Sequence, residues 1–473
     1  MTKVLFATPP TSMKERYGDM AEAGSSLPSL GILFLAAITR HKGHPTTLID
    51  ASALNLNCEQ LLNRVEAERP DVLGLSATTF SITQAATFAS MIKERVPGIR
   101  VFIGGPHVSA APLETMERFK DFDVAVIGEG EETILELLQA VNAGASFQGI
   151  PGIVLRCGEE IVSTSRRPFL HDLDQLPYPA WDLLEGFPER YPPAPFKVRN
   201  LPAASLVTSR GCPNHCIFCD RSVFGASCHA FSAEYVVGMI RHLVERYGIR
   251  EFSFEDDTFI TFKKRLVAIC QGIINLGVKI SWTCLGRVNS VDEETLALMK
   301  RAGCWQISFG IESGNQHILT TIHKQATLEQ IRKAIALCSK TGMLSKGFFI
   351  VGHPGETKET LDQTIKFALE LPLDDISVTM LTPFPGTEIF KRADEFGVYE
   401  GDWGQMNLLN ALFVPYGLTR ENLEQTQREL HRRFYLRPRI ILGYLRRMLL
   451  NPSMTKGMLL GARAFFRSIR NPQ

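Results

Sequence analysis

The sequence predicts an α/β protein with a doubly wound N-terminal domain, a partial barrel of six β/α units and a helical C-terminal segment. Two observations predict this fold class. Short apolar, β-rich runs alternate with helical patterns in residues 1–150 and again in residues 203–395. A stretch with nine of the 26 prolines, residues 151–202, separates the two series. Alternation of strands and helices at this spacing predicts right-handed crossovers and parallel sheets.

In residues 1–150 the expected strands are 4–8, 46–50, 72–76, 101–104 and 124–128, and the expected helices are 30–41, 58–68, 82–95 and 113–119. Open parallel sheets bind ligands beyond the carboxyl ends of their strands. Small residues follow three of these strands, in the runs Ser76-Ala77-Thr78-Thr79, Gly104-Gly105-Pro106 and Gly128-Glu129-Gly130. They predict a broad, flat ligand that the backbone approaches closely.

Proline density makes residues 151–202 an extended connector on the surface or between domains. The second series has expected strands at 205–209, 251–255, 279–283, 305–310, 344–351 and 375–381, and expected helices at 233–246, 263–275, 293–301, 328–340 and 359–369. Six units are too few for a closed eight-stranded barrel, so a partial barrel of the TIM type is expected.

The composition indicates a globular enzyme. The chain has 473 residues, of which 45% are hydrophobic and 21% charged, and a formal net charge of +1. These values exclude a largely disordered chain and argue against a nucleic-acid binder. Ten cysteines are too sparse for a disulfide scaffold. The N-terminus reads as a first strand, and no apolar run is long enough to span a bilayer, so a cytoplasmic protein is expected.

The strongest motif is Cys212-Pro213-Asn214-His215-Cys216-Ile217-Phe218-Cys219, which follows the first strand of the second series. Three thiolates at this spacing can hold three irons of a 4Fe–4S cluster and leave the fourth iron without a protein ligand. The alternatives are a zinc knuckle and three unpaired structural cysteines. Zinc would normally need a fourth ligand, and His215 lies inside the loop, poorly placed to supply it.

A cysteine motif of this spacing after the first strand of a six-unit β/α series resembles the radical S-adenosylmethionine (radical SAM) superfamily. The resemblance implies that the open iron chelates the amino and carboxylate groups of SAM, and that residues at later strand ends bind the same cofactor. These are Phe218 near the adenine, Glu255 and Asp256 at the methionine amine, Arg287 at the carboxylate, Glu312 and Ser313 at the ribose, and Gly352 and Pro354 at the adenine.

Residues 1–150 resemble the Rossmann-like cobalamin-binding module of one branch of this superfamily, which contains anaerobic magnesium-protoporphyrin cyclase and many carbon methyltransferases. The implied cobalamin contacts are Pro10, Ser76, Thr78, Gly104, Gly105, Pro106, Gly128, Glu129 and Gly130. The chain lacks the DxHxxG motif that usually supplies an axial histidine. His107 is the nearest candidate ligand, although a loop histidine bonded to backbone is favoured. A Rossmann-like domain without a ligand is the alternative.

The resemblance implies three cofactors, namely a 4Fe–4S cluster, SAM and cobalamin, with reduction by a flavodoxin or ferredoxin. The predicted activity is methyl transfer to an unactivated carbon of a small or lipid-like metabolite, through a 5′-deoxyadenosyl radical and methylcobalamin. The alternatives are a radical SAM cyclase or rearrangement enzyme and, from another class, a cobalamin or cluster sensor.

The cysteines outside the motif are scattered along the chain. Cys58, Cys270 and Cys338 lie in helical patterns, and this scatter argues against a second cluster.

Residues 396–473 are expected to be helical with a basic tail, since residues 428–473 contain eleven Lys and Arg but only one acid. Such a tail is typical of peripheral contact with anionic membranes. The alternative, favoured for its first half, is a cap docked on the barrel.

Overall fold

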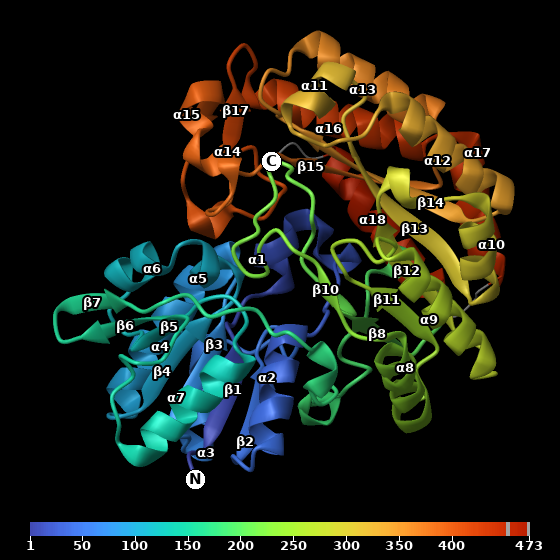
Figure 1. Cartoon of the computed structure of the whole chain (residues 1–473). Helices are drawn as coiled ribbons and strands as arrows, with labels where there is room; N and C mark the ends of the chain where they lie inside the picture. The colour runs from blue at the N-terminus through green and yellow to red at the C-terminus, as the bar shows by residue number, and fades with distance from the viewer. Residues whose placement is uncertain (451–454, 471–473) are drawn as a thin grey trace.

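The structure is a computed structural model that describes residues 1–450 and 455–470. Figure 1 shows two α/β units side by side, with the N-terminal unit in blue to teal and the barrel in green to orange. Of the last helices, in red, the one at Arg420–Tyr435 packs on the barrel, whereas the one at Thr455–Arg470 lies against the N-terminal turn Gly18–Ala23. The predicted fold class is confirmed: a doubly wound domain precedes a half-barrel and a helical C-terminal segment.

The N-terminal sheet has the strand order β2-β1-β3-β4-β5-β6-β7. Its parallel strands are β1 (Val4–Thr8), β2 (Thr46–Asp50), β3 (Val72–Ser76), β4 (Arg100–Gly104) and β5 (Val124–Val126). The helices of this unit are α1 (Met13–Tyr17), α2 (Leu30–His41), α3 (Cys58–Glu68), α4 (Ile82–Arg95), α5 (Pro106–Ala110), α6 (Pro112–Arg118) and α7 (Glu131–Ala143).

Alternate residues of the strands face helices on opposite sides of this sheet. Val4 and Phe6 of β1 pack with α2 and α7, whereas Leu5 and Ala7 pack with α3 and α4. All four are at most 2% exposed. Two covered faces explain why the strands read as continuous apolar runs, as parallel strands in doubly wound folds do.

The sheet continues past the expected boundary at residue 150. Strands β6 (Ile153–Cys157) and β7 (Glu160–Ser163) add antiparallel to β5 and to each other. The physical reason is the apolar run Ile153-Val154-Leu155 followed by a turn at Gly158, which has φ +65°. The prediction of a connector over all of residues 151–202 was therefore wrong for these eleven positions, 153–163.

The rest of the connector, residues 164–202, is partly buried between the two units. Leu173, Leu176, Trp181 and Tyr191 are buried in one core with Phe34 of α2 and the barrel helices. This segment contains the short 3-10 turns η3 (Leu173–Gln175), η4 (Trp181–Leu183) and η5 (Pro195–Lys197). It therefore joins the two units through a shared hydrophobic core.

The second sheet is all parallel and has the strand order β15-β14-β13-β12-β11-β8, so the barrel stays open between β8 and β15. Its strands are β8 (Ala203–Leu206), β11 (Glu251–Phe254), β12 (Ser281–Gly286), β13 (Cys304–Glu312), β14 (Leu344–Val351) and β15 (Asp375–Met380). Its helices are α8 (Ala233–Tyr247), α9 (Lys263–Asn275), α10 (Glu293–Arg301), α11 (Gln316–Thr321), α12 (Leu328–Thr341) and α13 (Lys358–Glu370).

Local sequence signals set several barrel helix ends. Thr327 and Gln330 form a capping box at the start of α12, and Gly342 ends that helix in the left-handed conformation at φ +68°. Gly248 ends α8 in the same way. Caps of this kind satisfy amide and carbonyl groups that the helix itself leaves unpaired.

The C-terminal region contains α14 (Glu388–Lys391), α15 (Ala393–Phe396), a hairpin of β16 (Gly397–Tyr399) and β17 (Phe413–Pro415), and α16 (Arg420–Tyr435), α17 (Pro438–Leu450) and α18 (Thr455–Arg470). The expected boundary at residue 395 falls inside α15, and the hairpin was not expected. Trp403, Met406 and Leu412 pack into the core of the N-terminal unit. Of the expected tail, residues 451–454 and 471–473 lie outside the described residues. Among the residues described, no helix is long and apolar enough to cross a bilayer.

Candidate functional site

The cysteine loop leaves the carboxyl end of β8. A two-residue ladder of β9 (Ser209–Arg210) and β10 (His229–Ala230) closes the loop at its base. Gly211 has φ +84°, and a side chain there would collide with the Ser227 carbonyl, so the loop needs glycine at this turn.

The three predicted cluster ligands lie in this loop with different exposure. Cys216 is buried, Cys212 is half-buried and Cys219 is exposed. The thiols of Cys216 and Cys219 are neighbours, and each perturbs the pKa of the other. Asn214 Nδ2 donates to Cys212 Sγ at 3.2 Å. Within residues 1–450 and 455–470, no three His, Cys, Asp or Glu side chains converge as a preassembled metal site, so ligation by all three cysteines stays a prediction.

Two cations stand beside Cys216. The neighbouring Cys219 thiol and then the charges of Lys324 and Arg287 lower the pKa of Cys216, and the neighbouring Cys216 thiol raises that of Cys219. Arg287 Nη1 lies 4.0 Å from Cys216 Sγ, and Arg287 Nη2 donates to the Lys324 carbonyl. This environment favours a thiolate at Cys216, the form that binds metals.

Lys324 is a site residue that sequence reasoning missed. Its Nζ lies 2.6 Å from Glu312 Oε1, with the two side chains 10% and 7% exposed, and 6.0 Å from the centre of the Phe218 ring. Lys324 follows α11 in a loop where His323 and Gln325 have positive φ. The signal in the sequence was weak, because a single lysine between two helices usually faces solvent.

The two residues of the predicted ribose motif, Glu312 and Ser313, point in different directions. Glu312 has φ +67° next to a register shift in β13, and its carboxylate points to Lys324. Ser313 has no exposed surface, and its hydroxyl lies 3.1 Å from Thr364 Oγ1 of α13. The structure thus brings Glu312 to the cysteine loop and places the Ser313 side chain against a helix, where it fastens the strand end.

The acids after β11 support the start of the cysteine loop. Asp256 is 1% exposed, and its Oδ1 accepts hydrogen bonds from Thr208 N, Thr208 Oγ1 and Ser209 Oγ at 2.9, 2.9 and 2.6 Å. Burial raises the pKa of Asp256. Glu255 is half-buried and accepts from Ser253 Oγ. Asp256 therefore holds the loop backbone, and Glu255 is the more accessible of the two predicted contacts.

The motif after β14 forms a closed turn. Glu356 Oε2 accepts from the amides of Gly352 and His353 at 2.7 and 3.0 Å, and Gly352 has φ +94°. Burial raises the pKa of Glu356 to about 8 and lowers that of His353 to about 3. Among the described residues, neither ring nitrogen of His353 has a hydrogen-bond partner, and the ring lies 5.8 Å from that of Phe218. Pro354 is buried in the same turn.

The small residues of the N-terminal sheet meet at its carboxyl edge, as expected. A Cβ on Gly105, which has φ +102°, would lie 2.7 Å from Ser76 Oγ and 2.8 Å from the Ala77 carbonyl. The ends of β3 and β4 therefore touch at Gly104 and Gly105. Thr78 and Pro106 are exposed beside them. Pro10 is half-buried near Ser52, which donates to the Pro9 carbonyl.

His107 lies in a packed core. It is 1% exposed, its Nδ1 lies 3.2 Å from Thr79 Oγ1, and its ring centre lies 4.4 Å from that of Trp403. Burial lowers the pKa of His107 to about 4. The Arg118 guanidinium lies 4.6 Å from the centre of the Trp403 ring. A hydrogen-bonded histidine was favoured, and the partner is a hydroxyl group rather than backbone.

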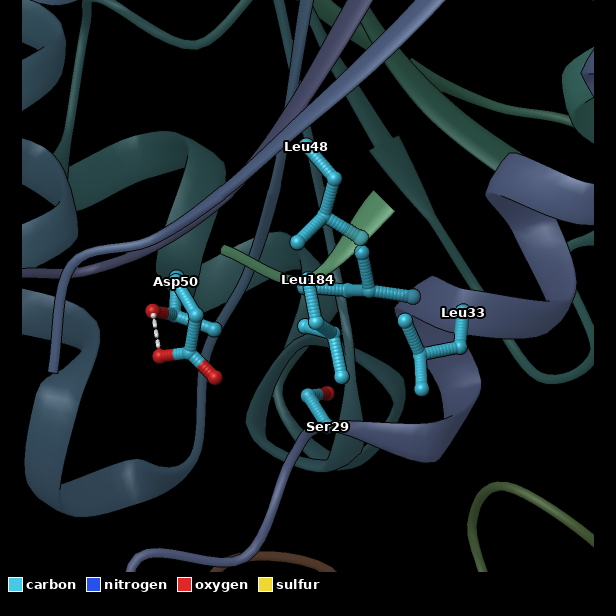
Figure 2. A pocket seen from close by; sticks show the side chains of 7 residues that line it. Ser29, Leu33, Leu48, Asp50 and Leu184 are labelled. Carbon is cyan, nitrogen blue, oxygen red and sulfur yellow. Dashed lines mark hydrogen bonds between the residues drawn. The ribbon is translucent and has the colours of Figure 1, made fainter. Parts of the chain in front are cut away.

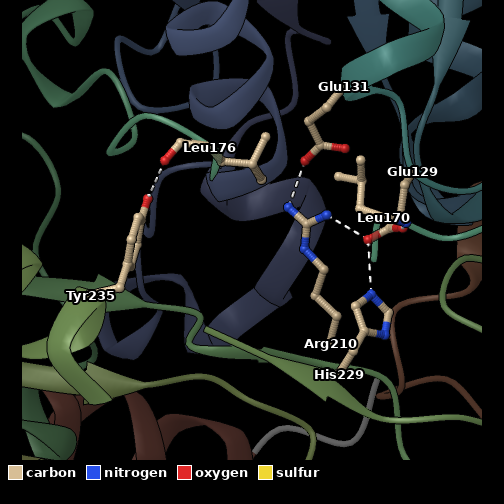
Figure 3. A network of polar contacts seen from close by, with 7 residues as sticks. All are labelled: Glu129, Glu131, Leu170, Leu176, Arg210, His229 and Tyr235. Carbon is tan, nitrogen blue, oxygen red and sulfur yellow. Dashed lines mark hydrogen bonds and ion pairs between the residues drawn. The ribbon is translucent and has the colours of Figure 1, made fainter. Parts of the chain in front are cut away.

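The run Gly128-Glu129-Gly130 lies against the cysteine loop. Gly128 has φ +76°, and a Cβ there would lie 3.4 Å from the Val223 carbonyl. Figure 3 shows the Glu129 carboxylate among protein donors: Arg210 Nη1 at 2.6 Å, His229 Nε2 at 3.1 Å and the Leu170 amide at 2.7 Å. The backbone of this run therefore remains a predicted cobalamin contact. The Glu129 side chain is instead hydrogen-bonded to residues of the barrel and the connector.

Figure 2 shows a narrow crevice at the carboxyl ends of β1 and β2, with the start of α2 and Leu184 beside it. The space between its lining residues, open solvent included, is about 170 Å³, and no water-sized sphere fits between them. Thr8 Oγ1 donates a hydrogen bond to Asp50 Oδ1 there at 2.9 Å. Burial raises the pKa of Asp50. In this structure the crevice therefore has no room for a ligand.

The remaining buried cysteines belong to the barrel core. Cys270, Cys284, Cys304 and Cys338 are buried in one core, where the Cys304 thiol donates to the Gln306 carbonyl at 3.7 Å. Burial raises the pKa of Cys270 and that of Cys338 to about 12. Protonated thiols of this kind are poor metal ligands and nucleophiles.

Two family models and several known proteins match the chain. Residues 18–138 match the model of the B12 binding domain, and residues 206–368 match that of the radical SAM superfamily. The chain is 34% identical to an uncharacterized methyltransferase of Pyrococcus horikoshii, over 93% of this chain and 94% of the relative. It is 29% identical to the anaerobic magnesium-protoporphyrin IX monomethyl ester cyclase of Cereibacter sphaeroides, over 91% of this chain and 71% of the cyclase.

A solved structure has a similar fold. The cobalamin-dependent SAM radical enzyme OxsB superposes with a TM-score of 0.73 and 18% identity, over 92% of this chain and 66% of OxsB. The domain order, the three-cysteine loop at the barrel edge and the extended match to the archaeal methyltransferase agree with one another. The chain belongs to the radical SAM enzymes with an N-terminal cobalamin-binding domain, the group of cobalamin-dependent radical SAM methyltransferases and their cyclase relatives.

Proposed function

We propose that this enzyme methylates an unactivated carbon of a small molecule, with the 4Fe–4S cluster and SAM at the barrel edge and cobalamin at the edge of the N-terminal sheet. The observation that carries the proposal is the position of the cysteine loop. It leaves the carboxyl end of β8 and touches the Gly128-Glu129-Gly130 turn at the carboxyl end of β5. Ligands at the two edges would share one interdomain space.

The residues present fit a cluster. Cys212, Cys216 and Cys219 supply three thiols in one loop, and the environment of Cys216 favours its thiolate. We assign the three cysteines as cluster ligands. Arg287 and Lys324 would balance the negative charge of the thiolates and the cluster. When bound, the cluster and SAM supply a carbon-centred radical, and cobalamin supplies the methyl group.

We assign the contacts with SAM to the residues around the same loop. Phe218 and the turn at Gly352 and Pro354 lie on one side, where His353 approaches the Phe218 ring. Glu255 and Glu312 lie on the strand ends beside it. Asp256 and Ser313 would act through the backbone that they fasten, because their side chains are bonded within the protein.

We assign cobalamin to the edge formed by Pro10, Ser76, Thr78, Gly104, Gly105 and Pro106 and by the backbone of residues 128–130. Exposed Thr78 and Pro106 and the close glycines leave room for backbone contact. Because Trp403 and Thr79 surround the His107 ring, we propose that no histidine of this edge reaches cobalt. Spectra of the cob(II)alamin form test this, since nitrogen splitting from a histidine would contradict it.

A test of the main proposal uses anaerobically reconstituted protein, methyl-labelled SAM and a host extract, followed by mass spectrometry. We expect about four irons per chain, 5′-deoxyadenosine and a labelled product. The variant with all three loop cysteines changed to alanine should bind no iron, whereas Cys58→Ala, outside the loop, should behave as the wild type. Iron retention in the triple variant would contradict the assignment.

The similarity to the cyclase favours cyclisation without methyl transfer as a second candidate. The same assay separates the two, because a cyclase would form 5′-deoxyadenosine but no labelled product. A flavodoxin or ferredoxin as electron donor belongs to the proposal, and replacement of a chemical reductant by either protein tests it.

We also propose that α17 attaches the enzyme weakly to anionic membranes. One face of this helix exposes Leu442, Leu445 and Leu449 to 64%, 49% and 81%. Arg439 and Arg446 are exposed on the same helix, and residues 438–450 include no acid. Each basic residue near an anionic surface contributes on the order of 1 kcal/mol.

Liposome flotation tests the attachment. Binding should rise with anionic lipid and fall with salt, because surface attraction is screened over about 10 Å at 0.1 M ionic strength. The variant with Leu442, Leu445 and Leu449 changed to Gln should not float, and Leu113→Gln, exposed on α6, should float as the wild type. Equal flotation of the triple variant would leave α17 as a cap on the barrel.

A further inference from the structure

Both ends of the cysteine loop are held by one turn of the N-terminal unit. Arg210 and His229 are opposite each other in the β9–β10 ladder that closes the loop. Glu129 Oε1 accepts hydrogen bonds from both, at 2.6 Å from Arg210 Nη1 and 3.1 Å from His229 Nε2. A single carboxylate of one unit therefore bridges the two chain segments at which the loop of the other unit begins and ends (Figure 3).

The second contact completes a fork. Arg210 Nη2 lies 2.5 Å from Glu131 Oε1, so each end of the guanidinium meets a different carboxylate. The side chains of Arg210, Glu129 and Glu131 are only 5%, 4% and 6% exposed. The planar fork of arginine fixes direction as well as distance, which a lysine could not do with two separate acceptors.

Aromatic rings and backbone hold this group from the sides. The Arg210 guanidinium lies 5.4 Å from the ring centre of Phe34 on α2 and 5.7 Å from that of Phe224 in the loop. The Leu170 amide of the connector donates to Glu129 Oε2 at 2.7 Å. The connector, the N-terminal unit and the barrel thus all meet at these charges.

Stability alone is a weak reason for this arrangement. Desolvation of a buried carboxylate–guanidinium–carboxylate group offsets most of the Coulombic gain, and apolar replacements are often neutral. What such a group does supply is a defined geometry, since any displacement of the loop would leave a buried charge unpaired. Only Gly211 separates Arg210 from Cys212. A fixed position of Arg210 therefore also restricts the position of Cys212.

We propose that Glu129, Glu131 and Arg210 form a positioning clamp that fixes the cysteine loop against the carboxyl edge of the N-terminal sheet. The clamp sets the separation between groups bound at the two edges. This inference deepens the proposed function, because the separation between cluster and cobalamin matters only if both are held there. None of the three residues needs to touch a cofactor to act in this way.

The test compares wild type with a variant in which the clamp is neutral, Glu129→Gln, Glu131→Gln and Arg210→Met together, so that no buried charge is left alone. A matched control removes the exposed pair between α2 and the connector, Arg40→Met with Asp182→Asn, whose side chains are 44% and 35% exposed and lie 2.6 Å apart. Arg210→Lys is a second variant that keeps the charge and loses the planar fork of the guanidinium.

Two measurements report the position of the loop without turnover. Hydrogen–deuterium exchange of residues 211–228 should quicken about tenfold or more in the neutral variant, less in Arg210→Lys, and not in the control. Pulsed paramagnetic resonance on protein loaded with reduced cluster and cob(II)alamin measures the dipolar coupling between the cluster and the cobalt. The distribution of this coupling should be narrow in the wild type and broader in the neutral variant.

The outcomes separate the two proposals. If the wild type holds no iron or no cobalamin, the proposed function fails, while the exchange measurement still decides whether the clamp orders the loop. If the wild type holds both and the neutral variant gives unchanged exchange and unchanged coupling, the clamp is refuted. If the neutral variant does not fold, unchanged exchange and coupling in Arg210→Lys would refute the clamp.

Discussion

A buried carboxyl group in the turn after β14 should make the stability of this enzyme depend on pH. Glu356 is 1% exposed and binds the amides of Gly352 and His353 through one oxygen. Burial raises the pKa of Glu356 from 4.5 to about 8. Between these values the folded protein keeps a proton that the unfolded chain has released. The free energy of unfolding must therefore fall as the pH rises through this interval.

The substitution Glu356→Gln isolates this effect. Glutamine keeps an oxygen for the two amides and cannot ionise. One unit of pKa corresponds to about 1.4 kcal/mol, so the wild type should lose up to about 2.7 kcal/mol relative to the variant between about pH 5.5 and about pH 7.5. His353, with a pKa lowered to about 3, contributes an opposite slope below its unfolded pKa of 6.5, but this slope is common to both proteins and cancels.

Urea unfolding at several pH values, followed by circular dichroism, measures the difference. Glu359→Gln is the matched control. This acid is exposed in the first turn of α13, and the Thr357 hydroxyl lowers its pKa, so the substitution should leave the slope between about pH 5.5 and about pH 7.5 unchanged. Parallel pH profiles for the wild type and Glu356→Gln would refute the reasoning. They would mean that Glu356 is ionised in the folded protein and that the two amide donors outweigh its burial.

Three more substitutions test the site. Lys324→Met leaves the buried Glu312 carboxylate unpaired and should cost about 3–5 kcal/mol in urea unfolding, most of which Lys324→Met with Glu312→Gln should restore. Gly105→Ala places a Cβ 2.8 Å from the Ala77 carbonyl at φ +102° and should cost about 1–3 kcal/mol; Gly98→Ala, at φ +92° in open space, should cost less. Trp403→Ala uncovers His107, so the pKa of His107, followed by NMR, should rise from about 4 toward 6.5.

The sequence was most informative where local pattern and burial agree. The five strands from β1 to β5 and the six strands of the barrel lie within a few residues of their expected positions, because each is a short apolar run between turn residues. Strands β6 and β7 were missed because proline density dominated the interpretation of residues 151–202. Their pairing depends on the edge of β5, which no local window contains.

The candidate site was predictable to the level of loops rather than side chains. Strand-end motifs identified the cysteine loop and the turns around it, but the direction of each side chain depends on tertiary partners. Ser313 turns to Thr364 and Glu129 to Arg210, although both stand in the motifs that predicted ligand contact. Lys324 escaped notice because its partner Glu312 lies twelve residues away, at a register shift that the sequence does not reveal.

The position of α17 limits what membrane attachment could do for catalysis. Tyr444 of α17 donates to Asp375 Oδ1 at 3.3 Å, and Asp375 is the first residue of β15. Met448 packs with Val198 and Ala203, next to the start of β8. The helix therefore lies at the amino ends of the strands, whereas the cysteine loop leaves the carboxyl end of β8. The six residues of β15 span about 20 Å at about 3.3 Å per residue.

A bilayer bound to the exposed leucines of α17 would thus face the end of the barrel opposite to the cysteine loop. Attachment through α17 alone would hold the enzyme near a membrane without presenting the cysteine loop to it. A lipid-like substrate would have to leave the bilayer and reach the interdomain edge through solvent. Attachment should therefore raise the rate only for substrates that exchange between membrane and water. For a water-soluble substrate, the leucine-to-glutamine variant of α17 should abolish flotation and leave turnover unchanged.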